Sequence, residues 1–394
     1  MVGGGPYCCG VTGDLPRAAK ALVGVRVLNQ LGAYVLAFLA VLAGPDLAAW
    51  ALGVFGIAAL VSRWLGGVLL DRLAPRTVIV LGLTATGAAM LLLAAARGSW
   101  LVLAAIALVG LAFELYEPAT QESLARITAS EHGRRGDVYG LLGTSLVAAG
   151  AVGGLLAAVL LPIGVRWLVV VDAVTCLVAA AVALAFLEPE PVRPGASRVG
   201  GGGRWRPPGP LVRLTVAGTA FACGCLAVLM FMPFALLQRG APEWLPGLAL
   251  TGAALLAPLT GHFGRRILSG LRHEPVLAVG TIVLGLLALT MAAGRAVPLM
   301  VAAYLAWAAV DSVLQGRWQA MIAELAPEAE RPRWFAFHGS SWGIAQPTVP
   351  VLVALAGGAA GGALLTAGGA FLLVPATLAA TSPLRRLKGR ATEP

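Results

Sequence analysis

The sequence is poor in charged residues. Only 12% of its 394 residues are Asp, Glu, Lys or Arg, whereas an average soluble protein has about 25%. Because 59% of the residues are hydrophobic, too few charged side chains remain to cover a surface in water. A water-soluble fold and an intrinsically disordered chain are therefore excluded. The composition is that of a protein with many membrane-spanning segments.

Residues that hold metals or nucleotides are scarce as well. The five cysteines and four histidines do not have the spacing of a metal site or of a disulfide framework. Neither lysine follows the Gly-x-x-x-x-Gly pattern that binds a nucleotide phosphate. We therefore expect no cofactor, no metal and no ATP-driven step. The short breaks between hydrophobic runs leave no room for a soluble catalytic domain, so we do not expect an enzyme.

Long hydrophobic runs dominate the chain. A helix needs about 20 apolar residues to cross the hydrocarbon of a bilayer, and twelve such runs follow one another. They cover residues 18–43, 47–70, 77–96, 99–125, 138–162, 165–187, 211–237, 245–271, 275–293, 297–323, 334–356 and 359–380. The first run is longer than the apolar part of a secretory signal, so we expect no cleaved peptide. The pattern predicts an all-α membrane protein with twelve transmembrane helices.

Basic residues are distributed unevenly between the connections. If both termini are cytoplasmic, 21 of the 28 Lys and Arg residues lie in inside segments, four in outside loops and three within spans. The excess agrees with the rule that cytoplasmic loops are positive. The net charge of +10 is then explained by membrane topology, and we expect no nucleic-acid partner.

The longest connection divides the spans into two sets of six. It is rich in Pro, Gly and Arg, which is typical of a flexible linker. We expect an N-terminal six-helix bundle, a cytoplasmic linker, a C-terminal six-helix bundle and a cytoplasmic tail, over residues 1–187, 188–210, 211–380 and 381–394.

The two halves show signs of duplication. With an offset of 198 residues, Leu69–Gly82 aligns without gaps with Ile267–Gly280, and Gln121–Ile127 aligns with Gln319–Leu325. One offset shared by two separate loops predicts two pseudo-symmetric bundles. Parallel six-span repeats are typical of transporters whose binding site lies between the repeats, near the membrane midplane.

The loop between the second and third spans carries a family resemblance. Residues 66–76 read GGVLLDRLAPR, which resembles the G-x-L-x-D-R-x-G-R-[KR] signature of the major facilitator superfamily. The matching residues are Gly67, Leu69, Asp71, Arg72 and Arg76, while Pro75 interrupts the usual ending. Residues 116–119 (YEPA) resemble the drug-exporter branch, which consists of proton antiporters. The resemblance extends over essentially the whole chain and implies the major facilitator fold.

The resemblance also implies a cytoplasmic gate. In this family the carboxylate at Asp71 faces the positive N-terminus of the eleventh span, near Trp334 here, and Arg72 and Arg76 complete a charge network. The alternative is an Asp-Arg pair that only sets topology in a tight turn. Two departures stand out: the second half has Ser269 and Gly270 at the equivalent positions, and the fifth span has Gly150 where antiporter signatures have proline.

Ionisable residues within spans are costly and are functional candidates. Glu114 and Glu117 lie three residues apart in the fourth span, which predicts one helix face, and Asp311 and Gln315 lie four apart in the tenth. In the resembled family these two spans line the central cavity, where opposed carboxylates would bind a proton and a cationic substrate alternately. The alternative is that each carboxylate bonds a neighbouring helix.

Three arginines lie within the predicted spans. Arg26 and Asn29 of the first span are further candidates for the cavity, although Arg26 lies near enough to the cytoplasmic end to extend into the interface instead. Arg63 and Arg317 have the same alternative, and either is able to partner a carboxylate.

The leading hypothesis is a secondary active transporter that exports a small hydrophobic or cationic compound in exchange for protons by alternating access. The alternatives are symport or facilitated uptake of a small metabolite, or a membrane-integral enzyme or sensor. We expect a monomeric multi-pass protein of a bacterial plasma membrane. Its partners would be a small-molecule substrate and the lipid bilayer, and a proton gradient would drive it.

Overall fold

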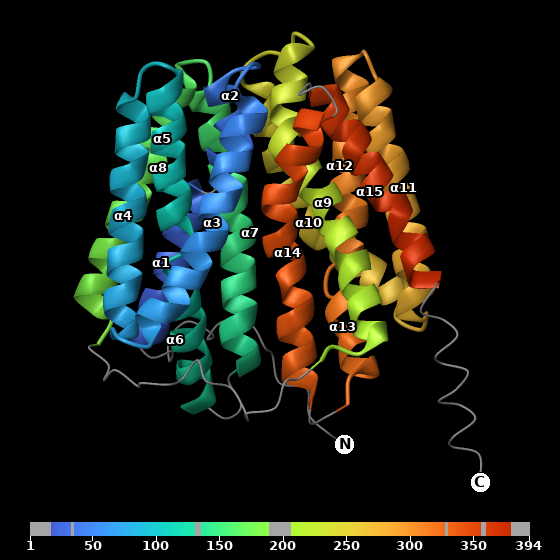
Figure 1. Ribbon diagram of the computed structural model, residues 1–394, viewed down its shortest axis with the longest axis horizontal. Coiled ribbons are helices and arrows are strands. Elements are labelled where there is room, and N and C mark those ends of the chain that lie inside the picture. The colour runs from blue at the N-terminus through green and yellow to red at the C-terminus, as the bar shows by residue number, and fades with distance from the viewer. Residues whose placement is uncertain are drawn as a thin grey trace, which may run out of the picture.

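The structure is a computed structural model, which describes residues 17–32, 35–130, 135–188, 206–327, 330–355 and 360–379. Within these ranges all regular elements are α-helices that run roughly side by side (Figure 1). The first half contains α1 (Arg17–Gly32), α2 (Val35–Ala43), α3 (Ala48–Leu70), α4 (Pro75–Ala95), α5 (Ser99–Phe113), α6 (Glu117–Ser130), α7 (Arg135–Leu160) and α8 (Val165–Phe186). The second contains α9 (Gly209–Gln238), α10 (Leu245–Ile267), α11 (His273–Ala293), α12 (Val297–Leu314), α13 (Arg317–Leu325), α14 (Arg331–Leu355) and α15 (Ala360–Ala379).

These helices make up twelve membrane-length rods, because α1 with α2, α5 with α6 and α12 with α13 each form one rod. The all-α fold with twelve rods is thereby confirmed, and most predicted spans agree with the helices to within a few residues. Most of the expected linker (189–205) and the expected tail (381–394) lie outside the described residues.

Two of the rods are less apolar than the rest. By length and hydropathy, ten stretches among the described residues qualify as membrane spans, and α10 and α14 are not among them. The physical reason is their polar content, which includes Arg265 and Arg266 in α10 and Ser340 and Ser341 in α14. Both helices contact the other half of the molecule, so less of their surface faces lipid.

The duplication inferred from sequence is visible in the packing. The bounds of α4 and α11 differ by 198 residues at both ends. A Cβ added at Gly82 of α4 would lie 2.9 Å from the backbone nitrogen of Tyr116, and one added at Gly280 of α11 would lie 2.6 Å from a methyl group of Leu314. Because Tyr116 and Leu314 are also 198 residues apart, the same close helix contact occurs in both halves.

Among the described residues, the most extensive contacts between the halves join α3 with α14, α7 with α10 and α2 with α9. Between α7 and α10, Gly154 and Gly247 bring the backbones into direct contact, since an added Cβ on either would collide with the opposite main chain. Between α3 and α14, a Cβ on Gly56 would lie 2.8 Å from the carbonyl oxygen of Gln346. Small residues at such contacts are typical of helix packing in membranes.

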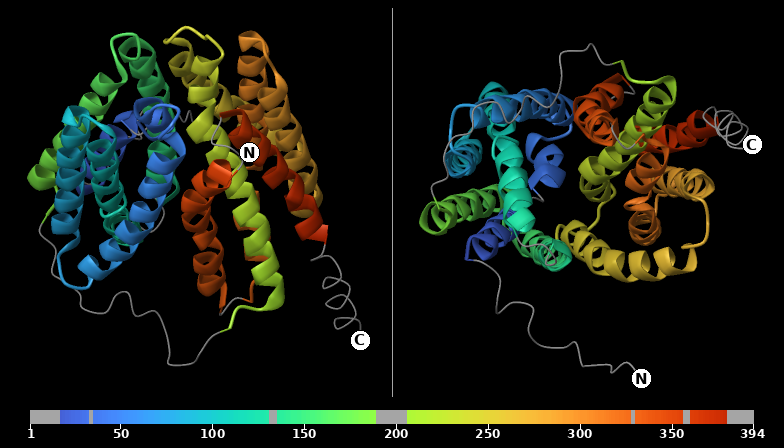
Figure 2. Two further views of the ribbon diagram at one scale, coloured as in Figure 1. Left: turned by 45° about the horizontal axis from the view of Figure 1, so that its top comes forward. Right: turned by 90° about the horizontal axis from the view of Figure 1, so that it is seen from below.

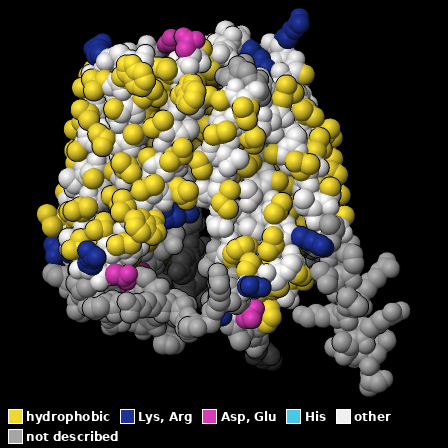
Figure 3. All heavy atoms as spheres, in the orientation of Figure 1, with side chains coloured by type: hydrophobic (Ala, Val, Ile, Leu, Met, Phe, Trp, Pro, Cys, Tyr) yellow, Lys and Arg dark blue, Asp and Glu magenta, His cyan; other side chains and the backbone are white. Residues whose placement is uncertain are grey.

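These contacts are concentrated at one end of the molecule. We call the end at which α1 begins the terminal side, and the other end the opposite side. Gly56, Gly154 and Gly247 all lie in the parts of their helices nearer the opposite side. On the terminal side the two halves part, and Figure 3 shows a hollow between them. Figure 2, viewed from below, shows the two groups of helices side by side. The protein is therefore open toward the terminal side.

Candidate transport site

The fourth rod is broken at its candidate carboxylate. α5 ends at Phe113 and α6 begins at Glu117, so the expectation that Glu114 and Glu117 share one continuous helix face is wrong. Glu114 caps α5, and its backbone N–H donates to the hydroxyl of Ser62 on α3 at 3.1 Å. The Ser62 hydroxyl thus accepts a hydrogen bond from a backbone N–H at the end of the helix, where regular helical bonding stops.

The tenth rod is broken at the corresponding place. α12 ends at Leu314 and α13 begins at Arg317, with Gln315 and Gly316 between them. Gly316 has φ of 81°, a left-handed conformation that residues with a Cβ rarely adopt. Hydropathy does not detect these breaks, because the apolar runs continue through them.

Glu114 and Glu117, the two acids at the break in the fourth rod, are each neutralised by an arginine. The Arg63 guanidinium lies 3.2 Å from the carboxylate of Glu114, and Arg26 of α1 forms an ion pair with Glu117. Gln121 donates a further hydrogen bond to Glu117 at 2.9 Å. Arg26 therefore points into the bundle instead of extending into the interface.

A second polar chain runs from this break to α8. Asn29 donates to the hydroxyl of Tyr116 at 2.5 Å and accepts a weak bond from the thiol of Cys176 at 3.7 Å. Cys176 also lies 3.8 Å from the carboxylate of Asp172, which is only 3% exposed and packs against Gly32. Asp172 thus has the packing environment expected for a structural group.

Asp311 in the second half has different partners. Its carboxylate accepts a hydrogen bond from the amide of Gln315 at 2.9 Å and a weak one from the thiol of Cys225 on α9 at 3.7 Å. Among the described residues, no lysine or arginine forms an ion pair with it. Arg317, six residues further on, instead donates to the backbone oxygen of Leu268 at 3.0 Å. Asp311 is thus held by neutral groups alone within the described part of the chain.

A cavity lies beside each break. The one in the first half measures about 330 Å³ and is lined by Arg26, Glu117 and Gln121. The one in the second half measures about 90 Å³. Its lining includes Gln315, Gln319, Phe221, Trp318, His338 and Trp342. Trp318 and His338 are stacked with ring centroids 5.6 Å apart. The first cavity therefore contains an ion pair among apolar and polar side chains, whereas aromatic rings and amides line the second.

The residues of the expected gate lie at the terminal side. Asp71 caps the end of α3, and Arg72 beside it is exposed. Arg76 donates to the backbone oxygen of Leu184 at the end of α8, and Gly67 has open space around its α-carbon. The pairing of Asp71 with the eleventh span stays a prediction.

Sequence reasoning left the partners of the acids undecided. The contacts of Arg63 and Arg26 join residues 51 and 91 positions apart, which no local pattern reveals. The cysteine spacing likewise gives no sign that Cys225 lies against Asp311. Among the described residues, no group of three or more His, Cys, Asp or Glu could hold a metal ion.

Comparison with known proteins places these features in a family. A family model described as Major Facilitator Superfamily matches residues 22–244. A Na(+), Li(+), K(+)/H(+) antiporter of Planococcus maritimus is 32% identical over 157 residues, a stretch that covers 37% of this chain and 37% of that protein.

Solved structures of similar fold cover almost the entire chain. The peptide transporter POT, solved in complex with sulfate, superimposes with a TM-score of 0.75 at 16% identity, over 95% of this chain and 96% of that one. The nucleoside transporter NupG gives 0.72 at 11% identity, over 92% and 100%. At such identities the likeness concerns the fold alone.

Proposed function

Because this chain belongs to the major facilitator superfamily, and is thus a multi-pass secondary transporter of small molecules, we propose that it exports a small cationic or hydrophobic compound in exchange for protons. The exchange uses alternating access, with a proton gradient as driving force and no cofactor. The chain acts as a monomer in the plasma membrane of a bacterium.

The observation that carries this proposal is the difference in charge compensation between the acids. Glu114 and Glu117 each have an arginine partner, whereas Asp311 is held by an amide and a thiol. An ionised carboxylate within the membrane is costly unless a positive charge lies beside it. Asp311 is therefore stable when it carries a proton or when a cation is bound, and these two states exclude each other. Such a site exchanges one for the other.

The surroundings of Asp311 favour an organic cation. Beside its helix break lie the aromatic rings of Trp318 and Trp342, and the indole of Trp342 is 43% exposed. A cation over the face of an indole is attracted by the ring quadrupole. The same rings supply apolar area for the hydrophobic part of a substrate.

The proposed direction of transport follows from the inward proton gradient, because each proton that enters on Asp311 exchanges for a substrate that leaves. With the terminal side in the cytoplasm, as the excess of basic residues indicates, the hollow is open toward the cytoplasm. A substrate enters there and binds when Asp311 loses its proton. After the halves rock, a proton from outside displaces the substrate. Each half-cycle leaves Asp311 electrically neutralised.

The similarity to the Planococcus antiporter supports a second candidate, exchange of Na⁺, Li⁺ or K⁺ for protons. A metal cation requires several oxygen ligands. The described partners of Asp311 are the amide of Gln315 and a thiol, and the cavity that Gln315 borders is lined by several aromatic rings. This donor set suits a metal ion less well, so we rank metal exchange second.

The test uses the purified protein in proteoliposomes with an internal pH dye. Addition of a fluorescent organic cation, such as ethidium, should drive proton movement in the opposite direction, and Na⁺ or K⁺ alone should not. Asp311→Asn should abolish the exchange, while Asp46→Asn in the exposed loop before α3 should not change it. Proton movement driven by Na⁺ or K⁺ would establish the second candidate. Co-directional movement of proton and substrate, or undiminished exchange in Asp311→Asn, would overturn the proposal.

A further inference from the structure

A groove on the outer surface of the second half has no role in the transport cycle described above. It measures about 620 Å³, which is within the range of ligand pockets, and it lies between the end of α10 and the start of α11. Val310, Val313 and Leu314 of α12 form its floor, while Leu271 and Val279 form its walls. Leu271 and Val279 are 55% and 62% exposed, so the groove opens toward the lipid.

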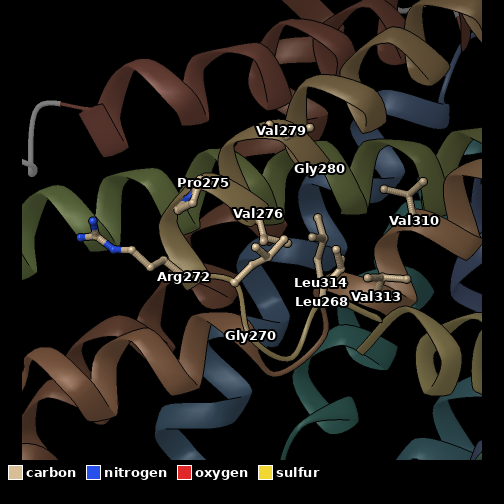
Figure 4. A pocket seen from close by; sticks show the side chains of 11 residues that line it. Leu268, Gly270, Arg272, Pro275, Val276, Val279, Gly280, Val310, Val313 and Leu314 are labelled. Carbon is tan, nitrogen blue, oxygen red and sulfur yellow. The ribbon is translucent and has the colours of Figure 1, made fainter. Parts of the chain in front are cut away.

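The groove is apolar along its length and charged at one end. Figure 4 shows Val310 and Val313 at one end, Val276 near the middle, and Arg272 at the other end, its side chain extending away from the labelled apolar residues. Arg266, at the end of α10, is exposed at the same side of the molecule. A ligand that fits this arrangement has a flexible hydrocarbon part and an anionic head.

At four of the matching positions the first half carries the bulkier side chain, whereas at two others, Ala74 for Arg272 and Ala112 for Val310, it carries the smaller one. With the offset of 198 residues, Gly270 corresponds to Arg72, Val279 to Leu81, Val313 to Leu115 and Leu314 to Tyr116. In each pair the second half has the smaller residue. A Cβ added at Gly270 would meet no atom within 4 Å. The loss of the Asp-Arg pair in the second loop therefore coincides with open space at the groove.

We infer that this groove binds one anionic phospholipid from the leaflet at the terminal side, with an acyl chain over Val313 and Val279 and the phosphate near Arg272. The apolar lining accounts for the chain, because burying hydrocarbon among valines and leucines is favourable. The exposed arginines account for the head group, since basic side chains at a membrane surface attract anionic lipids. A zwitterionic lipid would gain the same stabilisation from its buried acyl chain. It would gain less from the arginines, because its head group carries no net charge.

The position of the site gives the lipid a mechanical role. Val313 and Leu314, at its floor, are the residues that pack on Gly264 and Gly280 and immediately precede the break at Gly316. A bound acyl chain would complete the packing behind the joint that carries Asp311, on the side away from the central hollow.

The test is a count of lipids retained by the full-length protein after detergent purification, measured by native mass spectrometry with added dioleoyl phosphatidylglycerol or dioleoyl phosphatidylcholine. We expect one phosphatidylglycerol to bind in preference to phosphatidylcholine. Arg272→Gln should weaken its binding roughly fivefold, and Val279→Trp, which fills the groove, should abolish it.

Two matched variants serve as controls. Arg295→Gln removes an exposed arginine of the same half at the opposite side, and Leu286→Trp adds the same ring at an exposed position of α11 outside the groove. Both should bind like the unmodified protein. Equal binding of the two lipids, or the same loss in Leu286→Trp as in Val279→Trp, would overturn the inference. Competition for the groove by the transported compound instead of by lipid would also overturn it. No transport is measured, so this outcome is independent of the proposed exchange.

Discussion

Glu117 in the first half and Gln315 in the second lie 198 residues apart in the sequence, each beside a break in its rod. Around Glu117 are Arg26 and Gln121, and around Gln315 are Asp311 and the aromatic cavity. The glycine contacts that hold the two breaks are equivalent, but the groups at the breaks are not. The two halves thus share the position of the helix break, but the side chains beside the break differ.

The divergence divides the tasks between the halves. In the first half Glu114 and Glu117 are paired with arginines, and these pairs hold α1, α3 and the fourth rod together. Asp172 on α8 has a hydroxyl and a thiol beside it but is packed against Gly32, away from the break. In the second half the carboxylate of Asp311 has no cationic partner among the described residues, so a mobile proton or cation is able to take that place. On the proposed function, the charge pairs at the break in the fourth rod serve structure, and the carboxylate of the tenth rod serves exchange.

The strongest way to break this comparison is to neutralise one acid in each half. Asp311→Asn should lower proton-coupled transport by on the order of 100-fold or more, because it removes the exchanging group. Glu114→Gln should lower it only a few-fold, since Arg63 already neutralises Glu114. Rates of substrate-driven proton flux in proteoliposomes measure both. Equal losses in the two variants would mean that both halves carry exchange.

The next test makes the first half resemble the second. Arg26→Met leaves Glu117 as an unpaired acid in a partly buried position and should lower the free energy of unfolding by about 2 kcal/mol. Adding Glu117→Gln, which introduces the amide found at the equivalent Gln315, should restore most of the lost free energy of unfolding. Thermal unfolding in detergent gives both values. A double variant no more stable than Arg26→Met alone would show that the charge pair is not what holds this region.

The joint of the second half can be tested by itself. Gly316→Ala places a Cβ on a residue with φ of 81° and should cost about 1 kcal/mol. Gly339 lies within α14 with no atom within 4 Å of an added Cβ, so Gly339→Ala is the control and should be neutral or slightly stabilising. Thermal unfolding again provides the comparison. An unchanged unfolding temperature in Gly316→Ala would show that the break does not require the left-handed conformation.

The smallest expected effect concerns the loop that only the first half retains. If Asp71 attracts the N-terminus of α14 when the terminal side closes, Asp71→Asn should shift the population toward the open state by a factor of roughly 2 to 5. Ser269→Ala, at the equivalent position of the second half, should not shift it. Labelling of a single cysteine at position 342, in a chain without other cysteines, reports the population. Unchanged labelling would leave Asp71 with a topological role alone.

Hydropathy and charge patterning predicted the fold well. The twelve rods and the pseudo-symmetry follow from the length of apolar runs and from one offset, both of which are local or nearly local properties. The breaks were missed because an average over about 20 residues does not register three turn residues such as 114–116. Gly316 was a usable signal for the second break, since glycine after a polar residue often ends a helix.

The candidate site was predictable only in part. The sequence identifies Glu114, Glu117 and Asp311 as unusual at membrane depth, but the pairing of Glu117 with Arg26 depends on how α1 packs against the fourth rod. Whether a basic side chain lies beside Asp311 likewise depends on how the helices pack. Their roles in exchange remain predictions.

The contact between Gly154 and Gly247 has a consequence for the energetics of rocking. Where the two glycines meet, the backbones of α7 and α10 are in contact, and the Thr251 hydroxyl donates to the carbonyl of Ala151 at 3.2 Å. None of these four residues is charged, so parting them separates no ion pair at this point. Opening this crossing therefore costs little electrostatic energy, and on the proposed function the occupant of Asp311 shifts the balance between the two access states.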